Sequence, residues 1–424
     1  MTQFFRYLYS ILFYCVLPFA FLRLLWRSGP QPAYRQGWNE RMGFYQDRLD
    51  KSIWVHAVSL GETIAATPLI EALIKAYPGL SIVVTNMTIT GSERTRLTFG
   101  DSVLQRYIPY DVPCAVNRFL SAFKPVIGVI METELWPNLM AGCHQKNIPV
   151  VIANARLSHQ SAKRYGRVSL ITREMLSSLS YIAAQDSPAM ERFIALGIDP
   201  KKISVTGNLK FDLELPADLS AKTDKLRLEM GSDRLIWVAA STHPTEEEII
   251  LAAHAQVLEK NPHSLLILVP RHPERFDLMA ALIEQEGFKM ARRSHGDLCL
   301  FDTQVYLGDT MGELLSLYAV ANVAFVAGSF AQIGGHNMLE PAALHKPVLT
   351  GPVLFNFAEI SQWMIQAKGM VVVHSADELS VTVNGLLSDP VAREAMGECA
   401  YSVIEKNRGA LKKQLDIIQE RIVI

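Results

Sequence analysis

Short apolar segments alternate with segments of helical periodicity along nearly the whole chain. Apolar runs of strand length are separated by stretches in which apolar residues recur every three or four positions, as they do in amphipathic helices. This alternation predicts an α/β fold with parallel sheets. The predicted strands are Ile53–Val58, Ile82–Thr85, Val126–Met131, Val150–Ala153, Tyr181–Ala184 and Ile203–Thr206 in the first half, and Ile236–Ala240, Leu265–Val269, Val323–Ala327 and Val348–Thr350 in the second.

The length of 424 residues favours two domains over one. The segment Phe211–Ser220 lies between the two sets of strands and is a plausible linker. We therefore expect a membrane helix within residues 1–30, a first Rossmann-like domain over 31–212 and a second over 213–424. The last stretch, Asp389–Glu420, has a helical and mixed-charge pattern. It could pack back on the first domain or be a simple terminal helix.

The N-terminus departs from this globular pattern. Tyr7–Leu22 is apolar apart from Ser10, and residues 1–35 carry four arginines and no acid. Its sixteen residues would span roughly 24 Å as a helix, which flanking apolar residues extend toward the thickness of a bilayer core. No small-residue cleavage site follows, so we expect a retained membrane helix rather than a signal peptide. The arginines predict that its flank stays cytoplasmic. Whether the helix spans the bilayer or lies in its interface is open at this point.

Composition narrows the function classes. Hydrophobic residues make up 49% of the chain and charged residues 20%, which is enough for two sizeable cores, and the net charge of −1 gives no sign of nucleic-acid binding. The five cysteines are scattered and lack metal-ligand or redox spacing. The histidines do not cluster either, and Asp212 with Glu214 is only a weak metal candidate. We therefore expect no metal site and no cofactor.

The glycine-rich segment Gly328–Pro341 follows a predicted buried strand and leads into a predicted short helix. A strand, a glycine loop and a helix start bring free backbone N–H groups together, which suits a phosphate. If the helix begins near His336, then His336 and Glu340 share a face, and Glu340 could accept hydrogen bonds from a ribose. The alternative is a glycine turn that serves packing alone. The late position of this segment predicts a nucleotide site in the second domain.

Ligands of open α/β sheets bind beyond the carboxyl ends of the strands, so the residues that follow each strand are candidates. Glu62 opens a helix after the first strand, where it could accept a proton from a hydroxyl or could simply complete a capping box with Ser59. Glu132 and Glu134 follow another strand together with Trp136, whose face could hold a sugar ring. These acids could instead serve the start of a helix.

Basic residues follow other predicted strands. Arg156, and less clearly Lys163 and Arg164, could hold the phosphates of an anionic substrate. Lys210 follows the last strand of the first half. In the second half, Arg271 lies between prolines at a strand end, where a stiffly held cation suits a phosphate or a carboxylate.

With these residues in view, the chain resembles the Kdo transferases of lipopolysaccharide assembly, which move Kdo (3-deoxy-manno-octulosonic acid) from CMP-Kdo onto a lipid A precursor. One departure is Ser241–Glu246, in which the resemblance would place a glycine after His243. The resemblance covers nearly the whole chain through the segments Val55–Glu62, Met131–Asn138, Asn154–Ser158, Gly207–Asp212, Leu268–Arg275, Gly308–Glu313 and Gly334–Glu340.

The resemblance implies a GT-B fold, in which two Rossmann-like domains face a cleft, and an inverting, metal-independent displacement at the cytoplasmic face of the inner membrane. Glu62 would be the catalytic base. The acceptor would be bound by Gly61, Glu132, Glu134 and Arg156. The CMP-Kdo donor would be bound by Lys210, Ser241, Arg271, His272, Met311, Gly312, Ser329, Gly334, Gly335, Asn337 and Glu340.

Two alternatives stay open at this stage. One is another GT-B protein, either a different membrane glycosyltransferase or a nucleotide-sugar epimerase, although the N-terminal helix disfavours a soluble epimerase. The other is a membrane-tethered glycan-binding protein without activity. The joint presence of Glu62, Arg271 and Glu340 argues against a protein that only binds.

Overall fold

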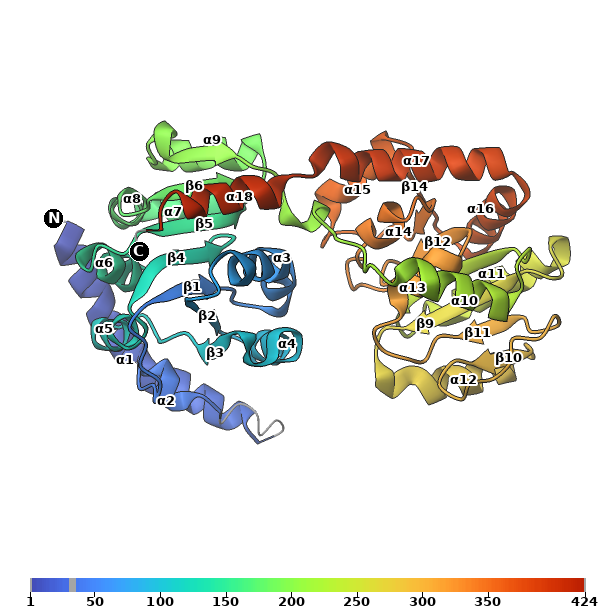
Figure 1. Ribbon diagram of the computed structural model, residues 1–424, viewed down its shortest axis with the longest axis horizontal. Coiled ribbons are helices and arrows are strands. Elements are labelled where there is room, and N and C mark those ends of the chain that lie inside the picture. The colour runs from blue at the N-terminus through green and yellow to red at the C-terminus, as the bar shows by residue number, and fades with distance from the viewer. Residues whose placement is uncertain (1, 30–35, 423–424) are drawn as a thin grey trace. The chain divides into compact units, whose positions relative to one another are not determined.

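The computed structural model describes residues 2–29 and 36–422, which form two compact units. The N-terminal unit comprises residues 1–212 with 408–424, and the C-terminal unit comprises residues 213–407 (Figure 1). Each unit is built on a seven-stranded parallel sheet, which confirms the predicted α/β class. The predicted membrane helix includes residues 1 and 30, and these lie outside the described residues, as does Arg35.

The sheet of the N-terminal unit has the strand order β3-β2-β1-β4-β5-β6-β7. Its strands are β1 (Ser52–His56), β2 (Ser81–Asn86), β3 (Leu104–Tyr107), β4 (Pro125–Met131), β5 (Val150–Ala155), β6 (Tyr181–Ala184) and β7 (Ile203–Val205). Its helices are α1 (Thr2–Arg27), α2 (Trp38–Arg41), α3 (Leu60–Ala76), α4 (Ile89–Phe99), α5 (Pro113–Phe123), α6 (Pro137–Gln145), α7 (His159–Arg167), α8 (Ser169–Ser177), α9 (Ser187–Leu196) and α18 (Ala410–Gln419).

The sheet of the C-terminal unit has the strand order β10-β11-β9-β8-β12-β13-β14. Its strands are β8 (Ile236–Thr242), β9 (Leu265–Pro270), β10 (Met290–Arg292), β11 (Val305–Leu307), β12 (Val323–Val326), β13 (Val348–Thr350) and β14 (Met370–Val372). Its helices are α10 (Leu219–Met230), α11 (Glu247–Lys260), α12 (Phe276–Gln285), α13 (Leu314–Val320), α14 (Leu339–Ala343), α15 (Ala358–Gln366), α16 (Ala376–Ser388) and α17 (Pro390–Asn407).

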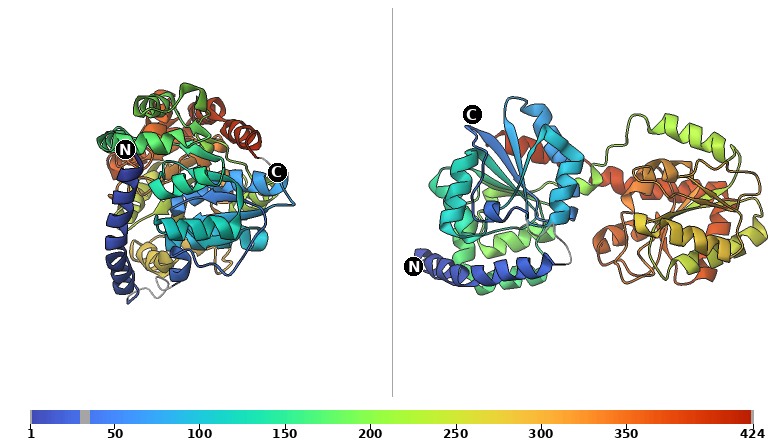
Figure 2. Two further views of the ribbon diagram at one scale, coloured as in Figure 1. Left: turned by 90° about the vertical axis from the view of Figure 1, so that its left-hand side faces the viewer. Right: turned by 90° about the horizontal axis from the view of Figure 1, so that it is seen from below.

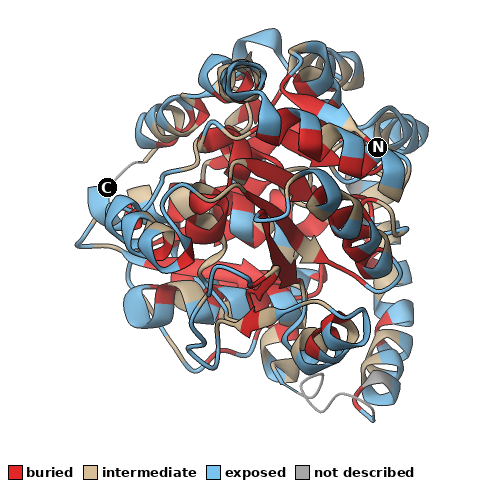
Figure 3. Cartoon of the chain, turned by 90° about the vertical axis from the view of Figure 1, so that its right-hand side faces the viewer, coloured by how far each residue is buried: buried red, intermediate tan, exposed pale blue. Residues whose placement is uncertain are grey.

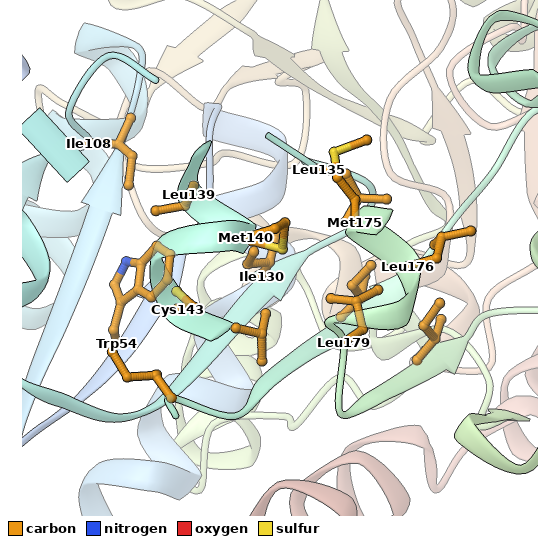
Figure 4. Close-up of a cluster of buried hydrophobic side chains, with 14 of the residues drawn as sticks. Trp54, Ile108, Ile130, Leu135, Leu139, Met140, Cys143, Met175, Leu176 and Leu179 are labelled. Carbon is orange, nitrogen blue, oxygen red and sulfur yellow. The ribbon is translucent and has the colours of Figure 1, made fainter. Parts of the chain in front are cut away.

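Alternating strand residues feed two cores, one on each face of the sheet. In β1, Trp54 joins the cluster that α5, α6 and α8 cover (Figure 4). Ile53 and Val55 join the cluster under α3 and α18. Side chains of a strand point alternately to the two faces, so a strand buried on both faces must be apolar throughout. In the C-terminal unit, the buried residues likewise concentrate on the strands and on the inner sides of the helices (Figure 3).

The predicted C-terminal helix, Asp389–Glu420, is two helices. Gly409 has a φ of 95°, which a glycine adopts at little cost, and the chain turns there between α17 and α18. Asp212 fixes this turn, because its carboxylate accepts hydrogen bonds from the backbone N–H groups of Gly409 and Leu411, both at 2.6 Å. The suggestion of Asp212 as a metal ligand is therefore wrong, because its carboxylate caps α18. The helix α18 belongs to the N-terminal unit.

Candidate functional site

In each sheet the strand order reverses beside the first strand of the unit. The reversal lies between β1 and β4 in the N-terminal unit and between β8 and β12 in the C-terminal unit. Ligands of such sheets bind beyond the carboxyl ends of the strands at this point. The loops that follow β1 and β4 contain Glu62 and Glu132, and those that follow β8 and β12 contain His243 and His336.

Glu62 lies in the first turn of α3, which Ser59 caps. Its carboxylate accepts hydrogen bonds from the Val58 N–H at 2.7 Å and from the Ser59 hydroxyl at 3.1 Å, so it does take part in capping. Burial nevertheless raises the pKa of Glu62 to about 7, and the negative charges of Glu132 and Glu134 add to the shift. A carboxylate with a pKa near neutrality suits a general base, so capping and proton acceptance are compatible here.

Glu132 and Glu134 lie close enough to Glu62 to affect its ionisation. Glu132 has a φ of 57°, which few residues other than glycine adopt, directly at the end of β4. Glu134 accepts a hydrogen bond from the indole N–H of Trp136 at 3.0 Å, and its own pKa is raised by burial and by Glu132. Trp136 is partly buried against the core and holds Glu134 in place.

Lys210 belongs to the N-terminal unit and sits among these acids. Burial lowers its pKa, while the carboxylate of Glu132 opposes that shift and Arg156 reinforces it. Lys210, Arg156 and Glu132 are thus within electrostatic range of one another. Arg156 is exposed, and Gly61 faces open space, since a Cβ there would meet no other atom within 4 Å. The carboxylates and cations of the N-terminal unit therefore form one group.

Sequence analysis missed the residues that hold this group. The side chain of Gln414, on α18, is fully buried; it accepts a hydrogen bond from Asn154 N–H at 2.9 Å and donates to Thr206 Oγ1 at 3.2 Å. The Asn154 side chain in turn accepts from the Leu209 N–H at 3.0 Å, next to Lys210. These bonds join the ends of β5 and β7 to the last helix of the chain.

The C-terminal unit brings cations and histidines together at its own reversal. Arg271 follows β9, and its N–H bonds to Thr242 O at 3.1 Å. The rings of His243 and His336 are stacked with 5.0 Å between centroids, and their Nε2 atoms are 2.8 Å apart. Such a bond needs one ring nitrogen to accept, so at least one ring is neutral. Burial lowers the pKa of His336 to about 4, and the neighbouring His243, Arg271 and His272 add to the shift.

Arg271 is free to meet an anion. It forms no ion pair with the residues that the structure describes, whereas Arg275, four positions later, pairs with the buried carboxylate of Glu247. Arg292 and Arg293 are paired as well, with Asp309 and Glu313. An unpaired guanidinium at a strand end suits a phosphate or a carboxylate.

The structure corrects the expected form of the glycine loop. Helix α14 begins at Leu339 rather than near His336 and is only five residues long, so His336 and Glu340 do not share a helical face. The N–H groups at the start of the loop are also not free. The buried carboxylate of Glu246 accepts from Gly328 N–H at 2.7 Å, from the N–H groups of Ser329 and Phe330 at 3.3 Å, and from His243 N–H at 2.9 Å.

Glu246 therefore joins the loop after β8 to the loop after β12. It lies inside the one segment that departs from the resemblance, where Pro244 stands in place of the expected glycine. Thr245 takes a φ of 76°, which a β-branched residue rarely adopts. Glu246 lies three residues after His243 and directly before α11. This spacing is typical of a capping acid, so Glu246 could have been recognised as one in the sequence.

Ser329 is not presented to a ligand. It is fully buried, its hydroxyl donates to Val326 O at 3.0 Å, and it accepts from Gly351 N–H at 2.8 Å. In this structure it ties the ends of β12 and β13 together. The Ser329 hydroxyl is therefore already bonded within the protein and is not available for the predicted direct contact with the donor.

The later part of the loop keeps its candidate residues together. Gly334 and Gly335 have φ values of 101° and 79°, and a Cβ on Gly334 would lie 2.5 Å from the ring of Phe355. Asn337 donates to Glu340 at 3.0 Å. Burial raises the pKa of Glu340, and the charge of Arg271 counters that shift, which places these two residues in range of each other.

The remaining predicted donor residues lie on neighbouring loops. Ser241 has a φ of 61° at the end of β8. Met311 and Gly312 are exposed at the tip of a loop. The two acids of this loop are bound by residues of the same unit. Asp309 accepts from Ser294 and Arg292, and Glu313 accepts from Arg293. His272 is exposed next to Arg271, with its ring 5.4 Å from that of His243.

No group of three or more histidine, cysteine or acidic side chains suited to a metal ion occurs among residues 2–29 and 36–422. The arrangement offers a proton acceptor near neutral pKa in the N-terminal unit and fixed positive charge in the C-terminal unit. Proton abstraction and stabilisation of an anionic leaving group are the chemistry that such groups support.

Comparison with known proteins identifies relatives over most of the chain. A family model described as 3-deoxy-D-manno-octulosonic-acid transferase (kdotransferase) matches residues 36–213. The chain is 47% identical to the 3-deoxy-D-manno-octulosonic acid transferase of Haemophilus influenzae over 98% of both chains. It is 36% identical to the enzyme of the same name from Bordetella pertussis over 88% of both.

A solved structure gives the fold. UDP-GlcNAc 2-epimerase from Neisseria meningitidis bound to UDP-GlcNAc is 15% identical, covers 87% of this chain and 100% of its own, and superposes with a TM-score of 0.58. At this identity the likeness concerns the fold alone. It agrees with two Rossmann-like sheets of GT-B type.

Proposed function

The chain belongs to the 3-deoxy-D-manno-octulosonic acid transferase family, and on that premise we propose that it moves Kdo from CMP-Kdo onto a lipid A precursor. The observation that carries the proposal is the group around Glu62, where burial raises the pKa of Glu62 to about 7 and two further carboxylates add to the shift. An acceptor hydroxyl needs such a base. A protein that only bound glycans would gain nothing from an acid whose ionisation is made costly.

The proposed reaction is a direct displacement at the anomeric carbon of Kdo. Glu62 takes the proton of the acceptor's sugar hydroxyl, and the resulting oxygen attacks the anomeric carbon of Kdo. The bond from that carbon to the CMP phosphate breaks, and CMP leaves with inverted configuration at the sugar. Arg271 and Lys210 stabilise the phosphate or the Kdo carboxylate, since both are held cations at strand ends.

The other residues serve binding. Asn337 and Glu340 would meet the ribose, and Gly334 and Gly335 would allow the phosphate to approach the backbone. His272, Ser241, Met311 and Gly312 would complete the donor side. Gly61, Glu132, Glu134 and Arg156 would contact the acceptor. Ser329 would act by holding the loop in place, because its hydroxyl is buried.

The reaction would take place at the cytoplasmic face of the inner membrane. Among the residues that the structure describes, one helix, Phe4–Trp26, is long and apolar enough to cross a membrane, and only 11% of its most apolar window is buried by protein. A lipid acceptor requires an enzyme at a bilayer surface. The arginines of this N-terminal segment favour the cytoplasmic side.

The direct test supplies the purified enzyme with CMP-Kdo and a lipid A precursor and measures CMP release together with the mass of the lipid product. We expect stoichiometric release of CMP and a lipid heavier by whole Kdo units. CMP release without a heavier lipid would indicate hydrolysis, and no CMP release with both substrates present would refute the proposal. Replacing CMP-Kdo with UDP-GlcNAc tests the epimerase alternative.

A further inference from the structure

Helix α1 lies lengthwise on the N-terminal unit. Near its start, Arg6 pairs with Glu174 of α8 at 2.9 Å, and Ser10 donates to the buried Asn138 of α6 at 3.0 Å. In the middle, Tyr14 donates to Cys114 of α5 at 3.0 Å. These contacts anchor the first half of the helix through polar bonds.

The second half of α1 is anchored by apolar contacts. Leu17 is buried in a cluster with residues around the start of α5, and Phe21 packs edge-on against Tyr110 with 5.7 Å between ring centroids. Leu24 packs against the same cluster. From Arg6 to Leu24 the helix is thus held over about 27 Å, which is nearly the thickness of a bilayer core. Figure 2 shows α1 running along the edge of this unit.

The opposite side of α1 is an uncovered apolar stripe. The large apolar residues of this stripe are 54% to 82% exposed, and Cys15 is exposed as well. The stripe consists of residues at three- and four-residue spacing: Phe4, Leu8, Ile11, Leu12, Cys15, Phe19, Leu22 and Trp26. Residues with this spacing share one helix face. We call these eight residues the outer stripe. The segment contains no acidic residue, and Arg23 is exposed near its end.

Because one face of α1 is docked on protein and the other is apolar and uncovered, α1 cannot cross the bilayer while it stays docked. Crossing would carry the covering surface of the unit into hydrocarbon, including the carboxylates of Glu174 and Asp111. Charged groups at that depth are costly. Undocking would instead strip Leu17 and Phe21 of their partners and leave Glu174 without Arg6. A helix that lies in the membrane plane meets neither cost.

We propose that α1 is an in-plane membrane helix, with the outer stripe immersed among the acyl chains of the cytoplasmic leaflet and the inner face docked on α5, α6 and α8. The occupant of the stripe is the lipid bilayer. Trp26 and Tyr7 lie toward the two ends of the helix, as interfacial aromatic residues do, and Arg23 can reach the headgroups. Immersion by about 5–10 Å is typical of such helices. This inference rests on the proposed function only in its choice of leaflet.

Depth measurements on the full-length protein test the orientation. Leu8, Cys15 and Leu22 are one heptad apart on the outer stripe, so a single cysteine at each of these positions can carry a fluorescent label. The other cysteines of the chain are replaced by alanine, and these are Cys114, Cys143, Cys299, Cys399 and, in the Leu8 and Leu22 variants, Cys15. The protein is bound to vesicles of phosphatidylethanolamine and phosphatidylglycerol that contain lipids with a quencher at a shallow or a deep acyl position. The matched control is a label at Leu97, which is 84% exposed on α4 of the same unit.

An in-plane helix places all three labels at one shallow depth, with the label at Leu97 unquenched. A spanning helix would separate the labels at residues 8 and 22 by about 21 Å along the membrane normal, with residue 15 deepest. That pattern would overturn the proposal, as would unquenched labels at all three positions. Unquenched labels with Cys15 disulfide cross-linking between copies would assign the stripe to a second copy of the chain.

A second measurement uses charge. Leu8→Asp with Leu22→Asp should lower binding to the same vesicles by roughly tenfold or more, whereas Leu97→Asp should leave it unchanged. Transfer to detergent-dispersed acceptor is measured in parallel and should persist. If the three labels lie at one shallow depth but the protein transfers no Kdo, the in-plane orientation of α1 is supported and the proposed transferase function is refuted. The two proposals can therefore fail separately.

Discussion

The two strand-order reversals of this protein have the same topology and opposite electrostatics. Beside β1 and β4, acids surround an acid, and the pKa of Glu62 rises to about 7. Beside β8 and β12, cations surround histidines, and the pKa of His336 falls to about 4. In both cases burial is the largest cause and the neighbouring charges have the same sign as the ionised group. The comparison teaches that one fold position can be tuned to accept a proton or to hold an anion by the loops attached to it.

Replacing the acid at the centre of the N-terminal group should have the largest effect. Glu62→Gln keeps the shape and a hydrogen-bond acceptor for Val58 but removes proton acceptance, so we expect kcat to fall by about 10²–10⁴. CMP release at saturating substrates measures it. Glu71→Gln, an exposed change on the same helix, is the control. Turnover within a few-fold of the unaltered enzyme would assign the proton to another group.

A change in the C-terminal unit should affect CMP binding instead. Glu340→Gln removes a carboxylate that would accept from ribose hydroxyls, and a charged hydrogen bond contributes about 1.5–3 kcal/mol, so CMP should bind about 10–100-fold more weakly. Calorimetry of CMP binding to the full chain tests this, with the exposed Glu394→Gln as control. An unchanged CMP affinity would leave Glu340 as a partner of Asn337 alone.

Glu246, which holds the loops of the C-terminal site together, can be tested separately from Glu340, which would contact the ligand. In Glu246→Gln, an amide NH₂ would face backbone N–H groups that now bond to a carboxylate. We expect a loss of about 1–3 kcal/mol in the free energy of unfolding, together with weaker CMP binding. Urea denaturation followed by circular dichroism measures it. The adjacent exposed Glu248→Gln should behave as the unaltered protein.

The sequence was a good guide to the strands that are apolar throughout and to the loops that follow them. It failed for β3, β10, β11 and β14, because these strands have only three or four residues and lie at or next to the sheet edges, and β3 and β10 also include polar residues. It also failed for Glu246 and Gln414. Their partners lie 82–84 and up to 260 positions away, and no local pattern reveals a hydrogen bond across such a separation.

The pH dependence of the rate should sharpen the contrast between the units. Only ionised Glu62 can accept a proton, so with a pKa of about 7 its active fraction, and kcat/KM with it, should fall by about tenfold per pH unit below neutrality. Glu62→Gln should lose this slope. His336, whose pKa is lowered to about 4, should stay neutral through the same range and contribute no titration there. A slope that persists in Glu62→Gln would assign it to a different group.

The smallest expected effect is that of chelation. On the donor side, the charge that develops on the leaving phosphate would be met by Arg271 and Lys210, which are permanently or normally cationic and held at strand ends. Two buried acids of the C-terminal unit have partners within the protein: Glu246 binds backbone N–H groups, and Glu247 pairs with Arg275. Fixed cations need no divalent ion, so the initial rate should be unchanged by EDTA. The matched variant is Arg271→Gln, which should lower the rate with and without EDTA alike. A rate abolished by EDTA and restored by magnesium, with Arg271→Gln still active, would transfer the leaving-group charge from the protein to a metal ion and would remove the electrostatic contrast between the two units.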